Sequence, residues 1–78
     1  RAVALGLGML EKGERKASVI LDAMKALINQ EALAKIDYVS MVDADSLQDV
    51  EFADRPVLCA MAVYFGKTRL IDNFSFKG

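Results

Sequence analysis

The stretch VLCAMAVYFGKTRLIDNFSF, residues 57–76, decides the fold of this chain. Its first nine residues are all apolar and include β-branched and aromatic side chains, which is typical of a central strand. Gly66 and Lys67 follow as a two-residue turn, and glycine in the first position suits a type II′ hairpin. Residues 68–76 then form the returning strand. The stretch therefore predicts a β-hairpin.

The register of this hairpin follows from the turn, because pairing proceeds outward from it. Phe65 faces Thr68, Val63 faces Leu70, and the series ends with residue 57 opposite residue 76. The face that these pairs share is apolar enough to receive helices. The opposite face, which begins with residues 64 and 69, is half polar and is expected to meet solvent or a partner.

Asp72 is the one charged residue on the apolar face. An unpaired buried charge costs several kcal/mol, so we expect its carboxylate to have a partner. Arg69 points to the other face, which leaves a backbone amide, a helix end or a hydroxyl as that partner. Arg69 itself is expected either to lie over the ring of Tyr64 or to bind an exposed anion.

Two helices are predicted before the sheet. Residues 2–11 are apolar nearly all round, and Gly6 and Gly8 within them indicate the close approach of another backbone. Residues 14–29 are expected to form the second helix, because apolar side chains recur there at helical spacing. The apolar stripe consists of Ala17, Ile20, Leu21, Met24, Leu27 and Ile28, with Met24 expected to fill the core.

The middle of the chain is expected to supply a third strand and an exposed loop. Residues 36–43 are rich in β-forming side chains. Residues 43–47 are turn-like, because Asp and Ser side chains bond nearby backbone amides, and residues 48–54 are polar and acidic. Asp43, Asp45 and Asp49 lack the glycine and closing glutamate of a calcium loop, which favours a solvated acidic loop.

These elements predict one domain of the α+β class over residues 1–78: two N-terminal helices packed on a three-stranded antiparallel sheet that ends in a β-hairpin. The chain is 54% hydrophobic, and a domain of 78 residues is too small to bury all of these side chains in its own core. We therefore expect either a homo-oligomer or packing against another part of a longer protein. Arg1 in place of an initiating methionine favours the longer protein.

Charge and cysteine content argue against several classes of partner. The net charge is −1 with both signs interspersed, so we expect neither a nucleic-acid surface nor a basic helix on a membrane. The single cysteine, Cys59, has no second cysteine in the chain with which to form a disulfide, which favours a reducing, cytoplasmic setting. Its place in an apolar run predicts a core thiol rather than a catalytic one.

No complete active site is expected in this chain, and no catalytic, cofactor-binding or metal-binding residue is assigned. The sequence contains no histidine, which removes Ser-His and Cys-His pairs and most zinc sites. Residues 66–68, GKT, resemble the end of a phosphate-binding loop, but position 61 is Met rather than Gly and a strand is predicted to follow. We therefore expect Lys67 to be solvated.

Three segments carry a resemblance to a known family: IDYVSMVD at residues 36–43, SL at residues 46–47 and FGKTRLIDN at residues 65–73. Their order and spacing closely resemble the C-terminal domain of the pantoate–β-alanine ligase family, also called the pantothenate synthetases. The resemblance spans essentially all 78 residues.

The resemblance implies an ATP- and magnesium-dependent ligase of cytoplasmic coenzyme A precursor biosynthesis. Such enzymes activate pantoate as a pantoyl-adenylate with release of pyrophosphate, and the amine of β-alanine then displaces AMP. Their catalytic motifs, a His-containing HIGH-type motif and a Ser-Ser-Arg-Asn segment, lie in a larger Rossmann-like N-terminal domain. Neither motif occurs here, so the resemblance implies a lid over the nucleotide site that binds no cofactor itself and partners that domain.

Two other interpretations stay open. The chain is alternatively a stand-alone α+β module with a structural or protein-interaction role, which would lack a Ser-Ser-Arg-Asn segment shortly before residue 1. A further alternative is a stand-alone nucleotide-binding domain that uses Lys67 and Arg69. Such a domain would bind ATP–Mg tightly.

Overall fold

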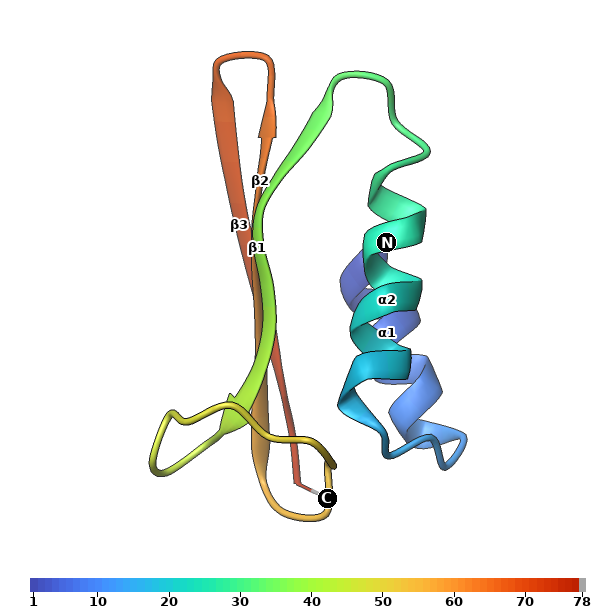
Figure 1. Ribbon diagram of the computed structural model, residues 1–78, viewed down its shortest axis with the longest axis vertical. Helices are drawn as coiled ribbons and strands as arrows, with labels where there is room; N and C mark the ends of the chain where they lie inside the picture. The colour runs from blue at the N-terminus through green and yellow to red at the C-terminus, as the bar shows by residue number, and fades with distance from the viewer. Residues whose placement is uncertain (78) are drawn as a thin grey trace.

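The computed structural model describes residues 1–77; Gly78, the last residue of the predicted domain, lies outside the described residues. A layer of two helices covers one face of a three-stranded antiparallel sheet (Figure 1). In chain order the elements are α1 (Ala2–Glu11), α2 (Ala17–Ile28), β1 (Ala34–Asp43), β2 (Val57–Phe65) and β3 (Thr68–Phe76). Strand β2 lies in the centre of the sheet. The predicted α+β fold is confirmed.

The hairpin of β2 and β3 has the predicted register. Phe65 pairs with Thr68, and the pairing continues without a shift to residues 57 and 76. Gly66 has a φ of +62°, and Lys67 is not among the residues with positive φ. Positive φ at the first turn residue alone is the type II′ pattern, whose twist matches that of the strands. The predicted turn type is therefore confirmed.

Helix α2 buries the predicted stripe against the sheet. Four of the six predicted residues are buried and the other two, Leu21 and Leu27, are partly buried against the core. Met24 lies at the centre with 0% exposure, and its sulfur is 3.9 Å from the thiol of Cys59 on β2. Helix α2 packs on β1, while α1 packs on α2 and β3.

The second helix begins three residues later than predicted. The Glu14 carboxylate accepts hydrogen bonds from the backbone amides of Arg15 and Lys16, at 3.1 and 3.0 Å. These bonds hold the chain in a turn at the position where the sequence predicts the helix to begin. A side chain that binds its own neighbouring amides competes with the helix, which is the physical reason for the difference.

The segment 48–54, predicted to be an exposed loop, is partly buried. The Ala17 amide donates to the Glu51 carbonyl and the Ala53 amide donates to the Arg15 carbonyl, both at 2.8 Å. Ala53 has 0% exposure, and Val50 packs against the core. The prediction of an exposed loop is confirmed for residues 48, 49, 51, 52 and 54. It was wrong for Val50 and Ala53, because isolated apolar residues give no periodic signal, although backbone pairing is enough to hold the segment in place.

Gly6 marks the closest approach of α1 to its neighbours. A β-carbon built there would lie 2.6 Å from the sulfur of Met24 and 3.3 Å from the ring of Phe74. The predicted close approach is thus confirmed for Gly6, although side chains rather than a backbone occupy the space. At Gly8 the prediction was wrong, because nothing lies within 4 Å of the corresponding position.

The helices cover the predicted apolar sheet face unevenly. Cys59 and Phe74 are buried, and so is Val63, whereas its pairing partner Leu70, near the hairpin turn, is 54% exposed. Asp72 is also exposed, and its carboxylate accepts a hydrogen bond from the Asn73 amide at 2.9 Å. The expectation that Asp72 sits on a covered face was therefore wrong, although its partner is a backbone amide, one of the three expected.

The two helical glycines make a matched pair for mutation. We expect Gly8→Ala to raise the free energy of unfolding by about 0.5–1 kcal/mol, because alanine favours the helix and the site is open. Gly6→Ala should lower it by about 1 kcal/mol, since the new methyl displaces the enclosed Met24 side chain. Urea denaturation of both variants measures the difference. Equal effects at the two positions would show that α1 does not approach Met24 at Gly6.

Candidate functional site

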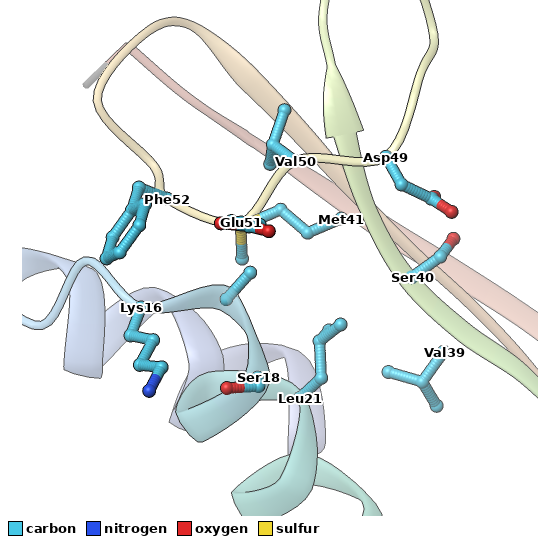
Figure 2. A pocket seen from close by; sticks show the side chains of 11 residues that line it. Lys16, Ser18, Leu21, Val39, Ser40, Met41, Asp49, Val50, Glu51 and Phe52 are labelled. Atoms are coloured by element: carbon cyan, nitrogen blue, oxygen red, sulfur yellow. The ribbon is translucent and has the colours of Figure 1, made fainter.

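Among the hollows on the surface of the described chain, two lie beside the helices. The first, here called the α2–β1 groove, has a volume of about 530 Å³ and lies between the start of α2, strand β1 and segment 49–52 (Figure 2). Its walls are apolar and its rim is polar. The lining residues are Lys16, Ala17, Ser18, Leu21, Val39, Ser40, Met41, Asp49, Val50, Glu51 and Phe52.

Binding rather than catalysis is the chemistry that the α2–β1 groove supports. In Figure 2, Leu21 points toward Val39 across the hollow, and Met41 lies below the segment that carries Val50. The hydroxyls of Ser18 and Ser40 border the groove, but the chain has no histidine to activate them. The groove therefore suits an apolar group with a polar edge.

The second hollow, here called the hairpin groove, has a volume of about 400 Å³. Its floor is formed by Met61, Val63, Phe65 and Leu70, and its sides are the last turn of α2 and the first residues of α1. Arg1, Glu31 and Asp72 are its charged lining residues. On the floor, Val63 is buried and Met61 is partly buried, whereas Phe65 and Leu70 are exposed to water.

A row of three polar side chains crosses the sheet on the face opposite the helices. Arg69 on β3 lies over the ring of Tyr64 on β2, with 5.9 Å from its guanidinium carbon to the ring centroid. Its Nε and Nη2 also donate to the Asp37 carboxylate on β1, at 3.2 and 2.9 Å. The predicted cation–π contact is confirmed, whereas the guanidinium is bound by a carboxylate rather than open to an anion.

Sequence reasoning missed Asp37 because its position depends on an irregularity in the sheet. Ile36 pairs with Val63 and Tyr38 with Ala62, so Asp37 is the extra residue of a β-bulge. A bulge changes the direction of a side chain, and no pattern of apolar residues around position 37 signals it. The charge of Asp37 opposite Arg69 was the only available indication.

The turn at residues 43–47 is confirmed as an Asp-capped turn. The Asp43 carboxylate accepts hydrogen bonds from the amides of Asp45 and Ser46, at 2.8 and 3.0 Å. These two bonds stabilise the charged form and, with Arg55 at 3.8 Å, hold the pKa of Asp43 below its usual value. The turn also holds Leu47 at a φ of +62°, which is unfavourable for a residue with a β-carbon.

Cys59 is confirmed as a core thiol. It is 1% exposed, and burial raises its pKa to about 11, so the thiolate that a nucleophile needs does not form near neutral pH. Within residues 1–77, no group of three His, Cys, Asp or Glu side chains is arranged to hold a metal ion. The assignment of no catalytic or cofactor-binding residue stays a prediction, as does self-association.

No helix within the described part of the chain is long and apolar enough to cross a membrane. Lys67 is exposed in the hairpin turn, as predicted, and strand β3 rather than a helix follows it. The turn therefore lacks the helix N-terminus that binds phosphate in a P-loop.

Comparison with known proteins gives a consistent family match. The model of the pantoate-beta-alanine ligase family matches residues 1–75. The pantothenate synthetase of Ruminiclostridium cellulolyticum is 54% identical over 76 residues, which are 97% of this chain and 27% of that protein. The pantothenate synthetase of Enterococcus faecalis is 47% identical over 77 residues, again covering 27% of that protein. The chain thus spans about a quarter of the length of these relatives.

A solved structure has the same fold. The crystal structure of the pantothenate synthetase from Thermus thermophilus superposes with a TM-score of 0.83 over 95% of this chain and 26% of that one. The sequence identity is 22%, so this likeness concerns the fold alone.

The lowered pKa of Asp43 predicts a stability that depends on pH. Its folded pKa lies below the unfolded value of 3.8, so its contribution is present above that value and is lost as the pH falls through the folded pKa. We expect Asp43→Asn to be less stable than the wild type at about pH 5 and the difference to shrink near pH 2. Urea titrations at both pH values measure it, with Asp45→Asn as the control for loss of one charge. A difference that is equal at both pH values would contradict the role of the carboxylate.

Proposed function

The chain belongs to the pantoate-beta-alanine ligase family, and we propose that it forms the C-terminal domain of a pantothenate synthetase. One observation carries this proposal. The sequence identity of 54% extends over 97% of this chain but reaches only 27% of the relative. The FGKTRLIDN motif at residues 65–73, which the family resemblance places near the end of the enzyme, supports the C-terminal position.

The whole enzyme, in this proposal, condenses pantoate with β-alanine in the cytoplasm. The pantoate carboxylate attacks the α-phosphorus of ATP to give pantoyl-adenylate and pyrophosphate, with magnesium bound by the enzyme. The amine of β-alanine then attacks the acyl carbon, and AMP leaves as the amide bond of pantothenate forms. Both steps belong to the Rossmann-like N-terminal domain, the main partner of the described residues.

The role proposed for this chain is that of a lid that keeps water from the adenylate. Its own chemistry supports a role without catalysis: the thiol of Cys59 is buried and protonated, and the serine hydroxyls of the α2–β1 groove have no histidine to activate them. The described residues also offer no cluster that fits magnesium, and we assign no ligand of ATP or magnesium to them.

The alternative of a stand-alone nucleotide-binding domain has less support. Arg69, one of its two proposed ligands, already donates twice to Asp37, and Lys67 lies on an exposed turn that a strand follows. A triphosphate would therefore lack the helix N-terminus whose backbone amides usually surround it.

The activity of the full-length protein tests the proposed function. We expect the full chain to exchange labelled pyrophosphate into ATP only when pantoate is present, because pantoyl-adenylate forms reversibly. Residues 1–78 alone should give no exchange, since they lack the adenylating domain. The assay compares both proteins with and without pantoate. A full chain without this exchange would overturn the proposed function, and exchange by residues 1–78 alone would overturn the lid role.

A further inference from the structure

The hairpin groove is an apolar part of the sheet that the two helices leave partly uncovered, with Leu70 54% and Phe65 36% exposed. We propose that it is filled by a continuation of α1: about two helical turns that directly precede Arg1 in the full chain. This inference rests on the proposed function, which places the remaining three quarters of the enzyme before residue 1. The occupant is thus a segment of the same polypeptide.

The first residues of α1 lack the chemistry of a helix start. Arg1 occupies the N-cap position and makes no capping hydrogen bond with its side chain, and the first turn holds no acidic residue. Natural helices usually begin with Ser, Thr, Asp or Asn, and a cation is unfavourable beside the positive end of the helix dipole. In the interior of a longer helix, Arg1 would not need to cap the helix and would lie away from the positive end of its dipole.

The direction of α1 leads into the hairpin groove. In Figure 1, α1 begins about halfway along the sheet, while α2 runs beside it toward the hairpin end. Arg1 and Ala2 already line the groove together with Leu70 and Phe65. A helix that continued in the same direction would therefore pass over the exposed floor.

The lengths agree with about two turns. Gly6 lies against Phe74, and Leu70 is four residues nearer the turn on the same strand face, a distance of roughly 13 Å at about 3.3 Å per residue. A helix rises about 1.5 Å per residue, so it reaches Leu70 about nine residues before Gly6, which is about four residues before Arg1. Two turns, roughly seven residues, extend the cover to the level of Phe65.

The lining of the hairpin groove also predicts which side chains the preceding segment has. Its floor of Met61, Phe65 and Leu70 calls for apolar side chains at helical spacing on one side of the segment. Two of the three charged residues that line the hairpin groove, Glu31 and Asp72, are acidic, and the third, Arg1, is basic. A basic residue one turn before Arg1 complements the same carboxylates.

Leu70 and Ile71 provide a matched pair for the experiment. They are adjacent, 54% and 60% exposed, and project from opposite faces of β3. Both residues line the hairpin groove, but alternation along the strand directs the side chain of Leu70 toward its floor and that of Ile71 toward the far face of the sheet. An aspartate at position 70 would place a charge beneath the segment, whereas an aspartate at position 71 would lie on the far face.

Hydrogen exchange measured by mass spectrometry on the full-length protein tests the proposal. We expect the amides of the seven residues before Arg1 to be as protected as those of α1 in the wild type. Leu70→Asp should speed their exchange about tenfold or more, while Ile71→Asp leaves it unchanged. Leu70→Ala, which removes apolar contact without adding charge, should give a smaller increase and serves if Leu70→Asp does not fold.

Three outcomes would overturn the proposal. They are rapid exchange of the preceding residues in the wild type, an equal response to the substitutions at positions 70 and 71, and a dimer in sedimentation that Leu70→Asp dissociates without altering this exchange. Pantoate-dependent pyrophosphate exchange by the same wild-type sample tests the proposed function separately. An active enzyme with an unprotected segment would refute the helix extension alone.

Discussion

The contact among Gly6, Met24 and Phe74 sets the distance between the helices and the sheet. With no β-carbon at position 6, α1 lies against the sulfur of Met24 and the ring of Phe74 at once. Met24 in turn reaches the thiol of Cys59 on the central strand. Because interiors are packed to the density of organic crystals, the missing methyl group at position 6 allows α1 to lie close to both α2 and β3.

Part of the sheet is left uncovered by the two helices. Cys59 and Phe74 are buried beneath them, whereas Leu70 near the hairpin turn is 54% exposed. On the far face, Arg69 bridges Tyr64 and Asp37 and so links all three strands. The far face thus carries a polar contact across all three strands, whereas the helix-bearing face leaves the apolar side chain of Leu70 exposed.

Sequence patterns predict the parts of this fold that depend on local periodicity. The hairpin register follows from the Gly66 turn and the alternation around it, and the α2 stripe follows from helical spacing. The late start of α2 and the burial of Ala53 in segment 48–54 were not predicted, because the Glu14 carboxylate and a few backbone bonds decide them. The Asp37 contact depends on a bulge, and the exposure of Asp72 depends on how far α1 extends. Such features depend on contacts between elements, and these contacts leave no periodic pattern in the sequence.

The crystal structure of the full-length protein would test most directly the claim that this domain is completed by residues outside it. In that structure the side chain of Leu70, 54% exposed here, is expected to be buried beneath a helix continuous with α1, with the contact of Gly6 and Met24 unchanged. A helix that instead starts at Ala2 and leaves Leu70 in solvent would contradict the account.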